Sequence, residues 1–402
     1  MTPESLKTQT EALVQFASNA AMPAAGGFGR LQSDGIVKQE LGLETWINCR
    51  MAYVFALELL AGNQACKTKA ELGQLALSET LKDSLYGGWV EAVGSSSVAN
   101  SNKAGYAHAF VLLAAATLNA ASVPGSDKLL QQVKEVISEK FWSEQEGACL
   151  ESFSADWTKL EDYRGANSNM HMVEAFLACF DQTGEKIWLD RALLITDRLL
   201  NVSARENNWR LVEHFNSSWT PVLDYNSSHK DHPFRPFGGT VGHWFEWARL
   251  AIQLKWALEL ETGDSPTWLT EVAKQLFQKA VDDGWQANGQ PGFCYTVDWD
   301  GEPVVDLRMS WVICEAISAA EVLALELDQS KYQGWSEVFW NYALEFFPDR
   351  EFGNWHSELD AQNQPSKIVW SDKPDVYHLY QALAFSRRRK AVSLISLFKQ
   401  DK

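Results

Sequence analysis

The sequence predicts an all-α fold built from six repeats, each with one outer and one inner helix, and three observations support this. First, a short pattern recurs six times, in which glycine or asparagine closely precedes an anchor residue that is aromatic in five copies. The six anchors are Phe28, Trp89, Cys149, Trp209, Phe293 and Trp355. Second, successive anchors lie about 60 residues apart, with one longer interval after Trp209. Such a period is typical of repeat architectures. Third, two helical patterns of different character separate successive anchors.

The first pattern in each repeat is amphipathic, which predicts a helix with one face toward solvent. Between Asp127 and Phe141, for example, Leu129 and Val133 recur at helical spacing while Lys128 and Glu135 fall on the opposite face. The predicted outer helices are Glu4–Ala20, Lys67–Lys82, Asp127–Phe141, Trp188–Leu200, Trp268–Val281 and Tyr332–Phe347.

The second pattern is apolar nearly all round, as is typical of a buried helix. The predicted inner helices are Trp46–Leu60, Tyr106–Leu118, Met170–Phe180, His243–Leu258, Trp311–Leu327 and Val376–Phe385. Because turn-rich and strand-like residues surround each anchor, we expect short β-hairpins to join each outer helix to the next inner helix.

We expect one continuous domain over residues 1–402, since no Pro/Gly/Ser-rich linker interrupts the repeats. The long interval is explained by an insertion at residues 216–239, directly before the fourth inner helix. Long loops in compact domains are usually functional, so we predict a lid, the alternative being a solvated loop without a role. Gly238 and Gly239 would give its base the freedom to hinge.

Composition excludes several functional classes. A net charge of −17 disfavours nucleic-acid binding, and no apolar run is long enough to span a membrane. The N-terminus does not resemble a signal peptide, and the six cysteines are scattered, so we expect reduced thiols and a cytoplasmic location. The chain shows neither a phosphate-binding glycine loop nor zinc-type spacing, so we predict no cofactor and no metal. The oligomeric state, a monomer or a small homo-oligomer, is left open.

Each inner helix opens with residues that are too polar or too large for a plain core. These residues are Trp46 and Arg50; Tyr106 and His108; Asn167 and His171; His243 and Glu246; Arg308 and Trp311; and Asp375, Tyr377 and His378. Equivalent positions of repeats stacked in a ring lie at the same height, so they should converge on one end of a central cavity. Because polar groups are costly to bury unless satisfied, the pattern predicts a polar pocket among aromatic rings.

Three of the eight histidines stand out, because His171, His243 and His378 occupy corresponding places in their own repeats. A single histidine at a helix start is more often structural than catalytic, and we interpret His108 in that way. The remaining histidines fall in predicted hairpins or in the insertion and are given no catalytic role. They are His214, His229, His232 and His356.

Several of these stretches together resemble the N-acylglucosamine 2-epimerase superfamily. RPFGGTVGHWFEWARL, from Arg235 to Leu250, is similar to its GH-x-x-E segment, and ETWINCRMAYVF, GANSNMHMVEAF and DVYHLYQAL look like its other inner-helix segments. The resemblance covers essentially the whole chain and is closest to the aldose–ketose isomerase branch, which includes bacterial mannose isomerases. It implies that the six repeats close into an (α/α)6 barrel. By resemblance, the active-site positions are Arg50, Tyr106, Asn167, His171, His243, Glu246, Trp311 and His378, with Glu315 one turn after Trp311.

The resemblance implies a monosaccharide substrate and the interconversion of D-mannose and D-fructose, by proton transfer between C2 and C1 through a cis-enediol. Histidine suits this chemistry because its pKa lies near working pH. We predict His243 and His378 as the acid/base pair, with His171 assisting ring opening. Arg50 could stabilise negative charge on an enediolate oxygen. The other predicted substrate-binding residues are Trp46, Tyr106, Asn167, Glu246, Trp311 and Glu315.

Other classes of protein remain open from the residues alone. Two histidines also permit 2-epimerisation, which needs proton delivery on both faces of the intermediate. An inverting glycosidase would need two carboxylic acids, for which Glu246, Glu315, Asp372 and Asp375 are available. A metal-dependent isomerase would need a cluster of carboxylates and histidines around an ion. A sugar-binding protein without activity would use the aromatic residues but has no need of three histidines.

Overall fold

The computed structural model describes residues 2–94 and 98–400, and the chain falls into two compact units. One comprises Val14–Ile195, Pro374–Tyr377 and Ala391–Lys402, and we call it the His171 unit. The other comprises Met1–Leu13, Thr196–Lys373 and His378–Lys390, and we call it the His243 unit.

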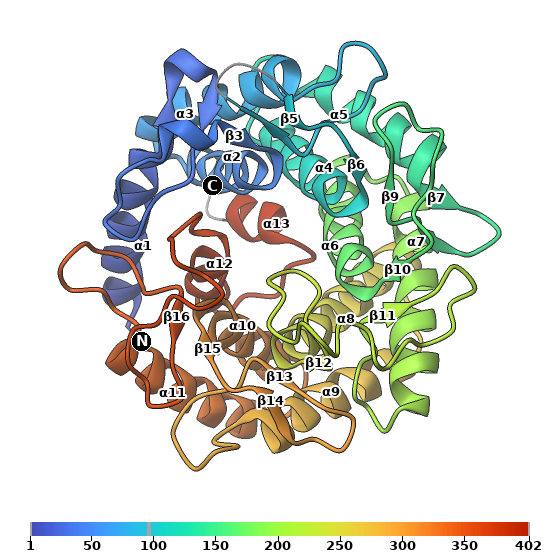
Figure 1. The fold of residues 1–402 in the computed structure, drawn as a ribbon, viewed down its shortest axis with the longest axis vertical. Helices are drawn as coiled ribbons and strands as arrows, with labels where there is room; N and C mark the ends of the chain where they lie inside the picture. Colours follow the sequence, from blue (N-terminus) through green and yellow to red (C-terminus); the bar gives the residue numbers. More distant parts are fainter. Residues whose placement is uncertain (1, 95–97, 401–402) are drawn as a thin grey trace. The chain divides into compact units, whose positions relative to one another are not determined.

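In the His171 unit, three long helices pack side by side in sequence order (Figure 1): α2 (Thr45–Leu60), α4 (Gly105–Ala120) and α6 (Ala166–Thr183). They correspond to the first three predicted inner helices. Each is followed by an outer helix: α3 (Lys67–Leu75), α5 (Ser126–Val136) and α7 (Ile187–Thr196), respectively. The last residue of α7 belongs to the other unit. A C-terminal helix that was not predicted, α13 (Leu394–Lys399), packs against α2 and α6.

In the His243 unit, α8 (Val241–Thr262) packs against α10 (Ser310–Glu326), and each also contacts the helix that follows it. These following helices are α9 (Trp268–Gly284) and α11 (Gln329–Phe346). Helix α12 (Tyr377–Phe385) begins with Tyr377, which belongs to the His171 unit, and continues in the His243 unit from His378. Helix α1 (Pro3–Ala17) is likewise divided, after Leu13.

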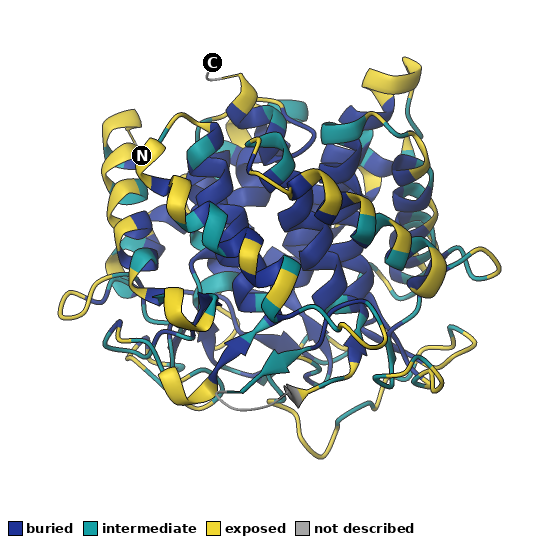
Figure 2. Ribbon diagram, turned by 90° about the horizontal axis from the view of Figure 1, so that it is seen from above, coloured by how far each residue is buried: buried dark blue, intermediate teal, exposed yellow. Residues whose placement is uncertain are grey.

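Burial separates the two kinds of helix as predicted. Most residues of α2, α4, α8 and α10 are buried, whereas α5 buries Leu129, Leu130 and Val133 and exposes Lys128 and Glu135. Figure 2 shows the same contrast, with some helices dark blue along their length and others carrying yellow stretches. All six cysteines are buried and unpaired. No helix in the described part of the chain is both long and apolar enough to cross a membrane.

The strands are all short, and most lie directly before an inner helix or beside an anchor. In the His171 unit they are β1 (Ala21–Met22), β2 (Gly27–Phe28), β3 (Leu43–Glu44), β4 (Ala92–Val93), β5 (Val98–Asn100), β6 (Lys103–Ala104), β7 (Trp142–Ser143), β8 (Ala148–Cys149), β9 (Ser152–Phe153) and β10 (Arg164–Gly165). In the His243 unit they are β11 (His214–Phe215), β12 (Gly239–Thr240), β13 (Thr296–Val297), β14 (Pro303–Val305), β15 (Arg308–Met309) and β16 (Glu358–Leu359).

Antiparallel pairs at the anchors form the predicted hairpins. Phe28 pairs in β1–β2 and Cys149 in β7–β8, while Trp89, Phe293 and Trp355 each form a single antiparallel bridge with a residue that ends or follows the preceding outer helix. At Trp209 the structure instead has a turn: the residue has φ +65° and its N–H donates to the Ala204 carbonyl at 2.7 Å. The prediction that short hairpins join the helices is therefore confirmed, and in the fourth connection the antiparallel bridge joins Phe215 and Pro221 rather than forming at the anchor.

One residue in the first turn of each inner helix of the His171 unit bonds the anchor of its own repeat. The side chains of Asn48 and Asn169 accept from the N–H groups of Phe28 and Cys149, and each also donates to the carbonyl four residues earlier in its helix. His108 makes the equivalent contacts with both ring nitrogens, to Trp89 N–H and the Ala104 carbonyl. This bonding satisfies buried backbone groups and confirms that His108 is structural.

The insertion, residues 216–239, is mostly turns and is attached at several points to other parts of the His243 unit. Tyr295 Oη donates to the Pro233 carbonyl at 3.3 Å, and Trp299 Nε1 donates to the Leu223 carbonyl at 2.8 Å. Gly238 has φ +87°, and a Cβ there would overlap the Val297 carbonyl of β13. Gly239 pairs with Val297, so these glycines allow the end of the insertion to lie close against β13. This role differs from the predicted hinge.

Candidate active site

His243, at the third residue of α8, is held by a buried carboxylate. Its Nδ1 lies 3.1 and 3.0 Å from Oε1 and Oε2 of Glu213, which precedes β11. Both side chains are buried. An imidazole that donates Nδ1–H to a carboxylate has its tautomer and ring orientation fixed, so Nε2 is the nitrogen that can accept a proton.

His378, on α12, has the same arrangement with a different carboxylate. Its Nδ1 lies 2.7 Å from Oε1 of Glu315, a fully buried residue of α10. The Trp311 indole lies against both imidazoles, with ring centroids 5.2 Å from His243 and 5.6 Å from His378. Two imidazole–carboxylate pairs therefore share one indole within the His243 unit.

A buried arginine joins the remaining carboxylates of this unit. Arg249 Nη2 lies 3.3 Å from Glu246 Oε1 and 3.2 Å from Glu315 Oε2, and Nη1 donates to Gln253 Oε1 at 2.9 Å. Ligand atoms of Glu246, Glu315 and His378 lie within 4.8 Å of one another, a spacing that could hold a metal ion. A fixed guanidinium already bonds both carboxylates and offsets part of their negative charge, however, which weakens the set as a cation site.

Arg50, on α2, is enclosed by aromatic rings in the His171 unit. Nη1 donates to Asp375 Oδ2 at 3.0 Å and Nη2 donates to Tyr106 Oη at 3.1 Å. The guanidinium carbon lies 5.1, 4.5 and 4.7 Å from the ring centroids of Trp46, Phe110 and Tyr377. Burial by itself lowers the pKa of Arg50, but Tyr106, Asp375 and Tyr377 outweigh it and raise that pKa above its ordinary value. The guanidinium is therefore a permanent charge.

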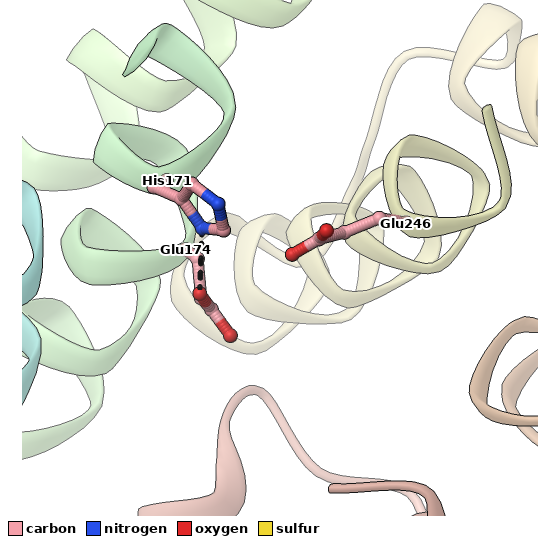
Figure 3. Close-up of side chains that lie close together, drawn as sticks. All are labelled: His171, Glu174 and Glu246. Atoms are coloured by element: carbon pink, nitrogen blue, oxygen red, sulfur yellow. Dashed lines mark hydrogen bonds and ion pairs between the residues drawn. The ribbon is translucent and has the colours of Figure 1, made fainter. Parts of the chain in front are cut away.

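His171, on α6, is bonded to a third carboxylate (Figure 3). Its Nδ1 lies 3.4 Å from Oε2 of Glu174, one turn later on the same helix, and the Tyr377 hydroxyl donates to the same oxygen. The Phe110 ring lies 4.5 Å from the imidazole and the Tyr106 ring lies 5.3 Å from it. One turn earlier, Asn167 Oδ1 is buried and has no hydrogen-bond partner among the described residues.

The structure thus gathers the predicted residues into two clusters, one in each unit. His243, His378, Glu246, Trp311 and Glu315 form the cluster of the His243 unit. Arg50, Trp46, Tyr106, His171 and Asn167 lie in the His171 unit. Of the other polar residues predicted at helix starts, Arg308 lies in β15 and bonds Asp306 and Asn288, and His108 bonds the backbone.

Sequence reasoning missed four members of these clusters. Glu174 and Arg249 lie three residues after His171 and Glu246, so helical spacing could have identified both. Phe110 is indistinguishable from other core aromatics. Glu213 gives a weaker signal: it lies four residues after its anchor, where the other described repeats mostly have apolar residues such as Val93, Phe153, Val297 and Leu359.

Comparisons with known proteins agree with one another. The profile of the N-acylglucosamine 2-epimerase (GlcNAc 2-epimerase) family matches residues 26–382. The chain is 46% identical over 379 residues to a D-mannose isomerase of Thermobifida fusca, covering 94% of this chain and 92% of that one. It is 42% identical over 391 residues to a D-mannose isomerase of Pseudomonas cannabina pv. alisalensis, covering 97% and 94%.

A solved structure of a D-mannose isomerase superposes with a TM-score of 0.88 at 26% identity, covering 96% of this chain and 97% of that one. Such agreement along nearly the full length shows the same fold. The predicted fold class, an all-α (α/α)6 barrel, is confirmed.

Proposed function

The chain belongs to the N-acylglucosamine 2-epimerase family, and on this premise we propose that it is a metal-independent aldose–ketose isomerase that interconverts D-mannose and D-fructose. The D-mannose isomerases among its relatives support the choice of sugar. The structural observation that carries the chemistry is the pair of imidazoles, His243 and His378, each held at Nδ1 by a carboxylate and both against Trp311.

The reaction needs a proton moved between two adjacent carbons. In the open-chain aldose, one imidazole Nε2 removes the C2 proton, electrons shift toward C1, and O1 takes a proton to give the cis-enediol. Return of the proton to C1, with loss of the O2 proton, gives the ketose. An imidazole whose carboxylate partner stabilises its protonated form suits both directions. We assign this work to His243 and His378.

The other predicted residues receive binding roles. Trp311 and Trp46 offer apolar faces to sugar C–H groups, and Asn167, Glu246 and Glu315 offer acceptors to hydroxyls. Arg50 already donates to Asp375 and Tyr106, so it acts on the sugar through the Tyr106 hydroxyl that it polarises. His171 assists ring opening.

The test is incubation of the purified protein with mannose, followed by chromatography of the products. Fructose as the first product, with solvent deuterium at C1 of fructose, supports the isomerase. Glucose as the first product would replace it with a 2-epimerase, and release of reducing ends from an oligosaccharide would indicate a glycosidase. Activity should survive exhaustive EDTA treatment, and loss of activity that one divalent ion restores would contradict metal independence.

The insertion, residues 216–239, is proposed as a lid over the His243 cluster. Its Pro233 carbonyl is bonded to Tyr295, whose ring packs edge-on against Trp311 at 6.0 Å. Removing residues 226–232 should lower kcat and raise KM together with little change in melting, because closure excludes water from the enediol. Steady-state kinetics on mannose checks this, and unchanged kinetics would remove the lid role.

A further inference from the structure

Glu358, in β16, is a fully buried carboxylate that bonds one short surface segment, residues 366–370. Its Oε1 accepts from the Ser366 hydroxyl and from Ile368 N–H. Its Oε2 accepts from Val369 N–H at 2.8 Å and from Trp370 N–H at 2.9 Å. Consecutive N–H groups that converge on one anion fix the backbone that carries them. Because a carboxylate is costly to bury, the fold uses an expensive group to hold a segment of which no residue is buried.

The last residue of the 366–370 segment, Trp370, presents its indole to the insertion. Its ring lies edge-on against Phe234, with centroids 5.5 Å apart and planes at 87°. This geometry is favourable for two aromatic rings. The residue before Phe234 is Pro233, whose carbonyl accepts from the Tyr295 hydroxyl. The insertion is therefore held at two adjacent residues, by Trp370 and by Tyr295.

Both supports of the insertion are tied to the ring shared by the two imidazoles. Tyr295 packs edge-on against that ring, Trp311, at 6.0 Å. Glu358 pairs with Met309 between β15 and β16, two residues before Trp311 in the chain. The 366–370 segment is thus fixed to the start of α10, which also carries the shared ring. The insertion therefore rests on supports that have fixed places relative to the imidazole pair.

We propose that Glu358 is a positioning residue of the isomerase, which holds Trp370 as the surface on which the insertion closes. The proposal rests on the proposed function in taking the insertion as a cover over the imidazole pair. Glu358 acts through the backbone of Trp370, and Trp370 acts through Phe234, so neither needs to touch the sugar. Loss of the contact lowers the closed fraction of the protein, and the apparent affinity for the sugar falls by the same factor. The effect is therefore expected in KM, because a saturating sugar keeps the insertion closed and leaves kcat nearly unchanged.

Three variants separate the contribution of the ring from that of the carboxylate. Trp370→Ala removes the ring but leaves the backbone bonds to Glu358, so the segment keeps its place. Trp370→Phe keeps an aromatic ring against Phe234. Glu358→Gln replaces one acceptor oxygen with an NH₂ donor, which faces backbone N–H groups and releases the segment. Phe352→Ala is the matched control, because Phe352 is an exposed aromatic residue of the same unit.

Steady-state kinetics on mannose measures the effect on KM. Trp370→Ala and Phe234→Ala should each raise KM about two- to tenfold, the range expected for loss of one aromatic pair. Because both changes remove the same contact, the double variant should have a KM no higher than that of either single variant. Glu358→Gln should raise KM by a similar factor, whereas Trp370→Phe and Phe352→Ala should stay near the wild type. A carboxylate that only stabilises the fold would lower melting without this rise in KM.

Limited digestion with trypsin tests the same contacts without turnover. An exposed lysine lies in each element, Lys367 in the 366–370 segment and Lys230 in the insertion. Glu358→Gln should speed cleavage after both lysines, because the segment is released and the insertion loses its support. Trp370→Ala should speed cleavage only after Lys230, and Phe352→Ala should be cleaved like the wild type.

Ser366→Ala tests the carboxylate in a second way if Glu358→Gln does not fold by circular dichroism. It removes one hydrogen-bond donor from Glu358 and leaves the carboxylate in place. Cleavage after Lys367 should be faster than in the wild type, and equal cleavage would overturn the role of Glu358.

The outcomes distinguish this proposal from the proposed function. If the wild type makes no fructose, the isomerase is excluded, and the trypsin pattern decides whether Glu358 holds the insertion through Trp370. If the wild type makes fructose, an unchanged KM in Trp370→Ala would overturn this proposal and leave the isomerase standing. Effects of Trp370→Ala and Phe234→Ala that multiply in the double variant would overturn it too, because the two rings would then act separately. Equal cleavage after Lys230 in the wild type and Trp370→Ala would show that Trp370 does not hold the insertion.

Discussion

The imidazoles of the His243 unit and the guanidinium of Arg50 in the His171 unit are held in opposite ways. In the His243 unit, His243 and His378 each have one carboxylate at Nδ1 and share the Trp311 ring. In the His171 unit, Arg50 donates to Asp375 and Tyr106 and is surrounded by three aromatic rings. The first arrangement leaves each imidazole able to gain and lose a proton, whereas the second fixes a charge that never changes.

The imidazoles can therefore transfer protons, whereas the guanidinium contributes a fixed positive charge. An imidazole beside a carboxylate can be neutral or cationic, so it can act as base and then as acid. A guanidinium with a raised pKa cannot exchange protons near neutral pH, so its contribution is orientation and electrostatics. Variants of the two clusters should therefore fail in different ways.

The largest expected effect is loss of an imidazole from the His243 unit. His243→Ala and His378→Ala should each lower kcat by about 10²–10⁴-fold, because general acid–base catalysis contributes that much. Helical content should not change. Steady-state kinetics with mannose and circular dichroism measure both effects, and near-wild-type kcat in either variant would show that its histidine is not an acid/base catalyst.

The next largest effect tests whether a carboxylate contributes to catalysis by fixing the tautomer of its imidazole partner. Glu213→Gln should lower kcat by about 10²-fold with a smaller change in KM, because an amide can stabilise the wrong tautomer of His243. Steady-state kinetics with mannose measures kcat and KM of this variant.

Glu151→Gln is the matched control for Glu213→Gln. Glu151 is also buried, and it accepts from Gly165 N–H and the Ser168 hydroxyl, that is, from a backbone amide and a hydroxyl. Its substitution should lower stability and leave kcat and KM unchanged. An unchanged kcat in Glu213→Gln would show that Glu213 is only structural.

Substitution of Arg50 should lower the stability of the fold more than it slows proton transfer. Arg50→Lys keeps the charge but cannot satisfy both Asp375 and Tyr106, so it should destabilise the fold by about 2–3 kcal/mol. Arg205→Lys is the matched control, because Arg205 makes a two-point ion pair with Glu271 at the surface. Thermal melting should separate the two variants, and equal melting temperatures would contradict the assignment of Arg50 as a buried structural charge.

Periodicity was enough to predict the inner and outer helices, because a helix buried on one face and a helix buried on all faces differ in the spacing of their apolar residues. It also placed the three histidines near the starts of inner helices, where they are the sixth, third and second residues of α6, α8 and α12. Whether the carboxylate partner of a histidine could be predicted depends on its separation along the chain from a residue already singled out. Glu315 and Glu174 lie on helices at positions that helical spacing relates to named residues. Glu213 reaches His243 from 30 residues earlier, through packing that no local pattern encodes.

His108 sharpens the comparison, because both ring nitrogens of this imidazole bond backbone groups. It bonds Trp89 N–H and the Ala104 carbonyl in the place where the neighbouring repeats use Asn48 and Asn169. Burial lowers its pKa to about 3, and Lys103 also lowers it, while the bond to Ala104 opposes the shift. Lacking a carboxylate, this imidazole is kept neutral in the folded protein.

The smallest predicted effect follows from the lowered pKa of His108. Below pH 6.5 the unfolded chain binds a proton at this residue that the folded chain does not bind until about pH 3, so stability falls as pH falls through that window. Between pH 7.5 and pH 5 the loss is about 2 kcal/mol, which amounts to a few degrees in melting temperature. His108→Asn, which introduces the amide used by the other two repeats, should keep both backbone bonds and remove this part of the pH dependence. His108→Leu should remove it too but melt lower at both pH values, because Trp89 N–H and the Ala104 carbonyl lose their partner. Melting temperatures of the three proteins at pH 7.5 and pH 5 test this, and an equal shift in wild type and His108→Asn would show that His108 does not titrate on unfolding.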